Sequence, residues 1–178
     1  HAGSEEDVLL RFYECATKFN LDTIIRVTAD DPFKDPKVID DVYKLYLNNN
    51  CDYASNTLKP TYPEGIDIEI FNYSSLKKAN NSAKLLSERE HVTPYIWKNP
   101  NMFKIINIKA ENDFSKLRLT VDYESDFLLA QRILNHFYPD TSFGYEAIVE
   151  YLNSIKIYNI VERNEGYKKS LKEDLNES

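Results

Sequence analysis

Two stretches of this chain share a pattern of residues that could bind a metal ion. Residues 26–30 and 118–122 both read Arg-x-Thr-x-Asp, and each ends a short run of residues that favour β-strands. An Asp at the carboxyl end of a strand lies at the rim of a sheet, where open α/β folds bind ligands. Mg²⁺ commonly takes one or two protein carboxylates and fills its other positions with water and phosphate oxygens. The pattern therefore predicts that Asp30 and Asp122 bind one Mg²⁺.

The same positions also have an ordinary structural interpretation. Asp is frequent at strand ends and turns because its side chain hydrogen bonds the local backbone. Arg26 and Arg118 share strand faces with the two Asp residues, so each could bind a phosphate or a carboxylate through two parallel hydrogen bonds. A structural ion pair across the sheet fits the pattern equally well, and the sequence leaves both interpretations open.

A second group of reactive side chains lies at residues 87–91, which read Ser-Glu-Arg-Glu-His. The N-terminus of a helix favours anions, so Glu88, Arg89 and their neighbours are candidates for binding a sugar acid there. His91 and Glu90 are candidates for a general base. The alternative is a capping box formed by Ser87 and Glu90, surrounded by surface charges.

A third group follows the turn at Tyr62-Pro63-Glu64-Gly65. Asp67 and Glu69 alternate with isoleucines, so both carboxylates lie on one face of a predicted strand and suit a ligand rich in hydroxyl groups. A solvent-facing edge strand would have the same pattern. The four glycines are scattered at positions 3, 65, 144 and 166, so the chain contains neither a P-loop nor a G-x-G-x-x-G motif.

Strands that alternate with helices must position these groups, which predicts an α/β domain with a mixed sheet. Residues 103–108 and 117–121 are expected to form an antiparallel pair around residue 110. The expected helices cover residues 8–20, 36–49, 74–84, 87–98, 126–137 and 145–153, and the other strands cover residues 23–28, 53–55 and 66–71.

Composition bounds the possible partners. The 178 residues fit one domain, here residues 1–160, followed by a highly charged tail at 161–178. A net charge of −7 without a basic stripe predicts no nucleic-acid partner. Cys15 and Cys51 form no metal-binding motif and indicate a reducing compartment. No apolar run approaches the ~20 residues of a membrane span, so we expect a cytoplasmic protein without a membrane partner.

Taken together and in this order, the segments resemble the bacterial cytidylyltransferase family that includes the spore-coat polysaccharide proteins, relatives of the CMP-Kdo and CMP-acylneuraminate synthetases. The resemblance runs from Gly3 to Tyr167. Its most specific parts include Tyr-Pro-Glu-Gly-Ile-Asp-Ile-Glu at 62–69 and Ser-Glu-Arg-Glu-His-Val-Thr-Pro-Tyr at 87–95. The segments at 26–32, 55–57 and 117–123 add to it.

The resemblance implies a nucleotide-diphosphosugar-transferase-like fold, Rossmann-like, with a mixed sheet flanked by helices. It implies transfer of CMP from CTP to a sugar acid, with Mg²⁺ as cofactor on the two aspartates. It also implies that residues 62–69 and 88–91 face the sugar. The expected site residues are Arg26 and Asp30 for the nucleotide, Tyr62, Asp67, Glu69, Glu88 and Arg89 for the sugar, and Arg118, His91 and Glu90 for catalysis.

One part of the family pattern has no counterpart in this chain. The family begins with a strand and a basic loop that binds the CTP phosphates, so the chain resembles the carboxyl-terminal part of such an enzyme. We therefore expect little turnover without an upstream segment, and a partner that is either this missing N-terminal segment or a second copy in a homodimer. The alternatives are a metal-dependent glycosyltransferase-like domain and a non-catalytic module for sugar binding or oligomerisation.

Overall fold

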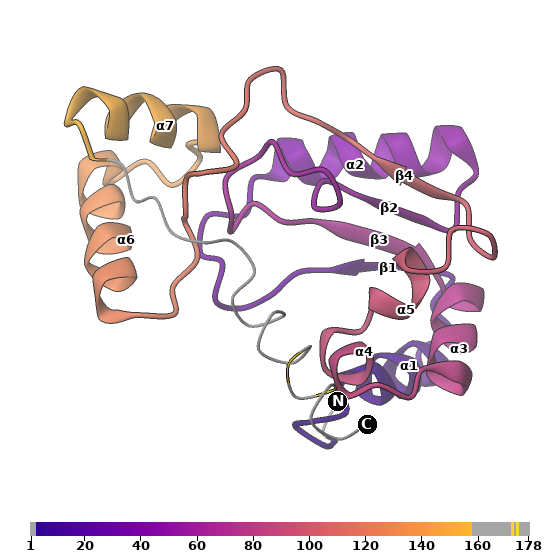
Figure 1. Ribbon diagram of the computed structural model, residues 1–178. Helices are drawn as coiled ribbons and strands as arrows, with labels where there is room; N and C mark the ends of the chain where they lie inside the picture. Colours follow the sequence, from indigo (N-terminus) through magenta and orange to yellow (C-terminus); the bar gives the residue numbers. More distant parts are fainter. Residues whose placement is uncertain (1–2, 158–171, 173, 175–178) are drawn as a thin grey trace.

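A four-stranded mixed sheet forms the centre of the molecule. The computed structural model describes residues 3–157, 172 and 174. Strands β1 (Thr23–Arg26), β3 (Glu69–Asn72), β2 (Tyr53–Ser55) and β4 (Ile105–Asn107) lie side by side in that order. The β1–β3 and β2–β3 pairs are antiparallel, whereas β2 and β4 are parallel. The predicted α/β class with a mixed sheet is confirmed (Figure 1).

Seven helices flank this sheet in the part of the chain that the structure describes. Asp7 and Asp35 cap the first two, because their carboxylates accept hydrogen bonds from the amides of Leu10 and Lys37. The helices are α1 (Val8–Lys18), α2 (Pro36–Asn49), α3 (Tyr73–Ser82), α4 (Leu86–His91), α5 (Pro94–Trp97), α6 (Glu124–Phe137) and α7 (Tyr145–Ser154).

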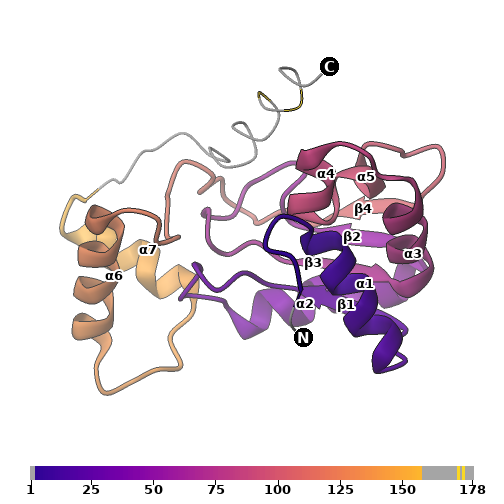
Figure 2. The same ribbon diagram turned by 90° about the horizontal axis from the view of Figure 1, so that it is seen from below.

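Each face of the sheet has its own apolar core. Tyr53 and Phe71 pack into the core that contains residues of α1, α3 and α5. Their neighbours Ala54 and Ile70 pack into the core that contains residues of α2, α6 and α7. This alternation follows from the two-residue period of a strand. Figures 1 and 2 show α2 on one side of the sheet and α1, α3, α4 and α5 on the other.

Asp35 connects the starts of two helices that are far apart in sequence. Its Oδ1 caps α2, and its Oδ2 accepts a hydrogen bond of 3.0 Å from the amide of Tyr145 at the start of α7. A Cβ on Gly144 would lie 2.7 Å from the same Oδ2 atom. A side chain at position 144 would displace this carboxylate, and the contact joins the start of α7 to the start of α2.

The predicted antiparallel pair around residue 110 is wrong. β4 pairs in parallel with β2, while residues 117–119 contact Glu64 through an isolated parallel bridge. The Glu64 amide donates to the Leu117 carbonyl at 2.9 Å, and the Leu119 amide donates to the Glu64 carbonyl at 2.7 Å. These bonds use the backbone groups that a pairing with β4 would need.

Several predicted elements have different bounds from those expected, and two of them differ most. The strand expected at 66–71 begins only at Glu69, because the Asn56 side chain bonds the Ile66 carbonyl at 2.8 Å and the Ile68 amide at 2.9 Å. The helix expected at 87–98 is divided into α4 and α5. Val92 has a φ of 71°, which ends α4, and Pro94 occupies the first position of α5.

Within the described residues, no helix is both long enough and apolar enough to cross a membrane. The expected tail at 161–178 lies outside the described residues except for positions 172 and 174. Its separation from the domain at 1–160 stays a prediction.

Candidate functional site

A cavity of about 350 Å³ collects several of the residues predicted from sequence. Its lining includes Arg26 from the end of β1, Asp67 from the segment before β3, Glu69 from the start of β3, and His91 from the end of α4. We call it the Glu69 cavity. The remaining lining residues are Thr57, Leu58, Thr93, Pro94 and Trp97.

The Glu69 carboxylate is the centre of a hydrogen-bond network in this cavity. Its Oε1 accepts bonds from the Tyr53 hydroxyl at 2.6 Å and the Thr93 hydroxyl at 2.5 Å. Its Oε2 lies 2.6 Å from Nη1 of Arg26. Glu69 is 7% exposed, so its charge is shielded from water and stabilised by these three donors. Burial, with the charge of Glu69 next, raises the pKa of Tyr53 well above its ordinary value, which keeps this hydroxyl a donor.

Arg26 presents a positive charge to the cavity in a fixed orientation. Its side chain is 20% exposed, and the ion pair with Glu69 restrains the guanidinium. A guanidinium has five N–H donors, so the bond to Glu69 leaves donors that can bind an anionic group of a ligand. The sequence left open whether Arg26 binds a ligand or forms a structural ion pair, and the structure shows that the ion pair exists.

His91 brings an imidazole to the same cavity. Burial lowers its pKa, although the neighbouring Glu90 carboxylate, at 3.6 Å from Nε2, opposes the effect. A neutral imidazole can accept a proton, which fits the predicted role as a base. α4 has no side-chain cap, so the alternative capping box of Ser87 and Glu90 does not form. The positive φ of Val92 turns the chain between His91 and Thr93, and both residues line the cavity.

The backbones next to Asp30 and Asp122 are held together. The Val121 amide donates to the Asp30 carbonyl at 2.8 Å, and the Thr120 hydroxyl donates to the same carbonyl at 3.3 Å. Asp30 is exposed, and the side chain of Asp122 is 47% exposed. Two accessible carboxylates thus come from segments about ninety residues apart, which we call the acidic edge.

The acidic edge has the donor type and number that Mg²⁺ requires when a nucleotide completes its coordination. Among the described residues, no group of three or more His, Cys, Asp or Glu side chains could hold a metal ion. One or two carboxylates are nevertheless typical for Mg²⁺ that is bound together with phosphates and water. In the same part of the chain nothing hydrogen bonds to the Asp30 carboxylate. These residues therefore fit the ion.

Arg118 lies beneath the acidic edge. It is 3% exposed, and its guanidinium contacts Glu64 at 3.2 Å and Asp126 at 3.4 Å, in addition to a short contact with Asp122. This is the structural ion pair that the sequence left as one of two interpretations. Arg118 orients Asp122 from below, and its predicted catalytic contact with the substrate stays a prediction.

Lys34 connects the acidic edge with the Glu69 cavity. Its Nζ lies 2.6 Å from Oδ2 of Asp31 and donates to the backbone carbonyl of Asp67. Asp31 also accepts a bond of 2.8 Å from the Thr28 hydroxyl. Asp31 is thus held by two donors, while the adjacent Asp30 faces solvent. The segment that carries Asp30 is attached to the segment that carries Asp67.

The other predicted substrate residues lie elsewhere. Arg89 bonds Asp7 at 2.6 and 3.0 Å and the Asn80 carbonyl at 2.9 Å, which connects α4 with α1 and α3. Glu88 is buried and lies 4.0 Å from Lys98. Tyr62 lines a second cavity of about 540 Å³. None of these three residues lines the Glu69 cavity, and their contacts with a sugar stay predictions.

The sequence patterns indicated no role in the site for Tyr53, Thr93 or Lys34. Tyr53 and Glu69 are diagonal neighbours across β2 and β3, where Tyr53 pairs with Phe71 and Ser55 pairs with Glu69. That register depends on tertiary pairing, which a single sequence does not reveal. Thr93 follows His91 by two residues, and this short spacing is the one local feature of the sequence that places Thr93 near the site.

Comparison with known proteins places the chain among cytidylyltransferases. A family model described as "Cytidylyltransferase" matches residues 1–168. An uncharacterized protein of Methanocaldococcus jannaschii is 39% identical over 137 residues, which cover 76% of this chain and 55% of that protein. The spore coat polysaccharide biosynthesis protein SpsF of Bacillus subtilis is 33% identical over 128 residues, which cover 70% of this chain and 52% of that protein. The chain thus spans about half the length of these relatives.

A solved structure shares both the sequence and the fold. The structure of a cytidylyltransferase from Leptospira borgpetersenii serovar Hardjo-bovis aligns with a TM-score of 0.83 and 32% sequence identity. The alignment covers 91% of this chain and 69% of that chain. The likeness therefore extends over most of this chain.

Proposed function

Because this chain belongs to the cytidylyltransferase family, we propose that it takes part in the transfer of CMP from CTP to a sugar acid. The observation that supports this proposal most strongly is the Lys34 connection between the acidic edge and the Glu69 cavity. A nucleotidyl transfer needs a metal-nucleotide site beside an acceptor site, because the two reactants must meet in line. The name of the Bacillus subtilis relative supports a further role in surface polysaccharide biosynthesis.

The Glu69 cavity is the proposed sugar site. Its volume of about 350 Å³ lies within the usual range of ligand pockets. Arg26 offers N–H donors to the carboxylate of a sugar acid, and the carboxylates of Asp67 and Glu69 offer acceptors to its hydroxyl groups. Since Glu69 is already fixed by Tyr53 and Thr93, the site is rigid before the sugar binds.

Asp30 and Asp122 are the proposed ligands of Mg²⁺, which would neutralise charge on the CTP phosphates when bound. Arg118 holds Asp122 in place through an ion pair, and Lys34 forms an ion pair with Asp31, the neighbour of Asp30. The sugar hydroxyl forms a new bond to the α-phosphorus, and the bond to pyrophosphate breaks on the opposite side. The hydroxyl proton passes to His91, which is neutral because burial lowers its pKa, or to Glu90 beside it.

The edge of the sheet supports the proposed partner segment. β1 pairs with β3 on one side, and the described residues supply no strand for its other side. Ile25 and Val27 are 41% and 49% exposed at this edge. An edge strand with exposed apolar residues is a template for another strand. We propose that the strand and phosphate-binding loop implied by the family resemblance pair with this edge. The alternative is that a second copy of the chain pairs with it.

Isothermal titration calorimetry with CTP tests this proposal in the presence and absence of Mg²⁺. We expect Mg²⁺-dependent binding to the chain, and loss of that binding in an Asp30→Asn, Asp122→Asn variant. A matched control variant, Asp40→Asn with Glu5→Gln, removes two exposed carboxylates that do not belong to the acidic edge and should bind as the unchanged chain does. Equal binding by the two double variants, or binding that ignores Mg²⁺, would contradict the proposal.

A further inference from the structure

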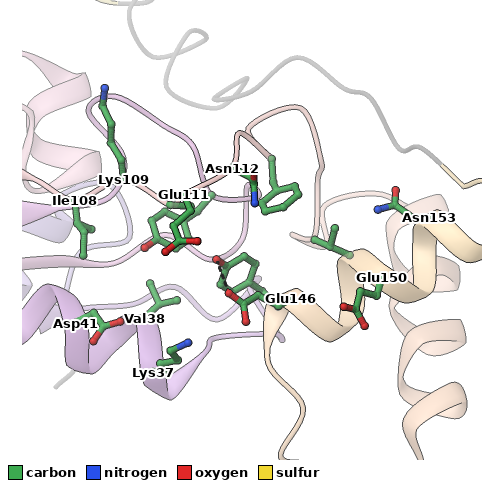
Figure 3. A pocket seen from close by; sticks show the side chains of 15 residues that line it. Lys37, Val38, Asp41, Ile108, Lys109, Glu111, Asn112, Glu146, Glu150 and Asn153 are labelled. Carbon is green, nitrogen blue, oxygen red and sulfur yellow. Dashed lines mark hydrogen bonds between the residues drawn. The ribbon is translucent and has the colours of Figure 1, made fainter.

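The second cavity is separate from the site described above. Its volume is about 540 Å³, and it lies between the start of α2, the segment that follows β4, and α7 (Figure 3). It shares no lining residue with the Glu69 cavity. Its buried lining belongs to the core of α2, α6 and α7, whereas Tyr53 beneath the Glu69 cavity belongs to the other core.

Three aromatic rings form one wall of this cavity. The centroids of Tyr62 and Tyr145 are 5.4 Å apart with planes at 63°, and those of Phe114 and Tyr145 are 6.3 Å apart with planes at 66°. Rings tilted in this way present faces in different directions. Both tyrosines are buried, and Val38 and Val149 complete the apolar lining. The wall resembles the aromatic cages that bind substituted ammonium ions through cation–π contacts.

Carboxylates outnumber cations around the rings. Asp41, Glu111, Glu146 and Glu150 line the cavity, against Lys37 and Lys109, and Asp41 also lies 3.6 Å from Nζ of Lys44 in an exposed ion pair. In Figure 3, Glu111 and Glu146 lie near the middle of the group, whereas the Lys109 side chain extends away from it. Burial, followed by the charge of Glu146, raises the pKa of Tyr145 to about 12. The rings therefore lie in a negative potential, which disfavours anionic ligands and favours cations.

We propose that this cavity binds an organic ammonium ion with apolar substituents, of the choline type. The apolar wall accommodates methyl or methylene groups, the ring faces attract the cationic centre, and the carboxylates neutralise it. A bare metal ion is a poorer match, because the apolar lining residues Val38, Phe114 and Val149 offer it no oxygen ligands. The inference depends on neither CTP nor Mg²⁺.

NMR titration of the full chain with choline chloride tests the proposal, with sodium chloride lowered in parallel to keep the ionic strength constant. We expect saturable shifts of the Tyr62 and Tyr145 ring signals. The neutral isostere 3,3-dimethylbutan-1-ol has the same shape without the charge, and it should bind at least about tenfold more weakly, since a desolvated cation–π contact has that magnitude. Equal affinity for both compounds, or shifts that do not saturate, would overturn the proposal.

Neighbouring residues of α2 provide a matched pair of variants. Asp41 lines the cavity, whereas the adjacent Asp40 does not. Asp41→Asn should weaken choline binding several-fold, while Asp40→Asn, with the same change in net charge, should leave it unchanged. Circular dichroism melting of both variants checks that the fold is retained. Equal weakening by the two substitutions would show that only the overall charge of −7 attracts the cation, and would overturn the assignment to this cavity.

Discussion

At the scale of single residues, Glu69 determines the shape of the candidate sugar site. One buried carboxylate receives the Tyr53 hydroxyl, the Thr93 hydroxyl and the Arg26 guanidinium. These donors come from β2, the turn before α5, and β1, so the carboxylate connects three parts of the fold. A buried charge is stable only when such partners compensate its lost hydration. The position of Glu69 is therefore a structural requirement, and its contact with a sugar stays a proposal.

Glu69→Gln is expected to lower the free energy of unfolding by about 2 kcal/mol. Arg26 would lose its charged partner, and the NH₂ group of the new side chain would face one of the donors that now bond to Glu69. Urea denaturation followed by circular dichroism measures this change. Glu6→Gln, at an exposed position, serves as the control and should have little effect. If the two variants unfolded at the same urea concentration, the network around Glu69 would not contribute as described.

His91 makes stability depend on pH. Burial lowers its pKa in the folded state, so the folded protein binds fewer protons than the unfolded chain below the ordinary value of about 6.5. This contribution to stability is present above that pH and is lost as the pH falls toward the folded-state pKa. Between pH 7.5 and 5.5 we expect the unchanged protein to lose more stability than His91→Gln in urea titrations. Parallel loss in both proteins would contradict the lowered pKa.

Sequence predicted part of the site at this scale. Asp67, Glu69 and His91, expected near the sugar, line one cavity, and Arg26, expected at the nucleotide, lines the same cavity. The place of Arg118 could not be derived, because its pattern matched that of Arg26 while its environment differs. Arg118 is enclosed by three carboxylates contributed by tertiary packing, and Arg26 is partly exposed beside one.

At the scale of elements, the turn at Gly65 positions the acidic edge. Gly65 has a φ of 99°, and a Cβ there would lie 2.7 Å from the Thr120 nitrogen and 2.8 Å from the Leu119 carbonyl carbon. The adjacent Glu64 makes two backbone bonds to residues 117 and 119 and also contacts Arg118. This close approach places the segment that ends in Asp122 beside the turn that precedes the Glu69 cavity.

Gly65→Ala should therefore destabilise the fold by about 2 kcal/mol or more, since an L-residue at positive φ is strained and its methyl group would collide with backbone. Thermal unfolding monitored by circular dichroism measures the loss. Gly3→Ala is a suitable comparison, because the Cβ there meets only the flexible side chain of Arg11. A melting temperature for Gly65→Ala equal to that of Gly3→Ala would refute the role of this turn.

Helical periodicity and a β-branched run predicted several elements, including α1, α2 and β1. The errors occur where a side chain or a backbone torsion replaces a regular hydrogen bond. Asn56 bonds the backbone of residues 66–68 and delays the start of β3. Val92 adopts a positive φ and divides the helix expected at 87–98. These irregular bonds and torsions depend on contacts between distant segments, and local sequence patterns do not encode such contacts.

At the scale of the whole molecule, two cavities that share no lining residue differ in chemistry. The Glu69 cavity combines Arg26 and His91 with carboxylates and lies near the acidic edge. The second cavity combines aromatic rings with a surplus of carboxylates. We propose a sugar acid for the first cavity and an organic cation for the second. Because the two cavities share no lining residue, we expect that the two ligands do not compete.

Paramagnetic broadening by Mn²⁺, a substitute for Mg²⁺, tests most directly whether the acidic edge and the Glu69 cavity form one site. In amide NMR spectra of the chain with CTP, we expect broadening to begin at Asp30 and Asp122 and to extend to Asp67 and His91. The Asp30→Asn, Asp122→Asn variant should lose this pattern. Broadening centred on Glu111 and Glu146, or spread evenly over the acidic surface, would contradict the proposed cytidylyltransferase site.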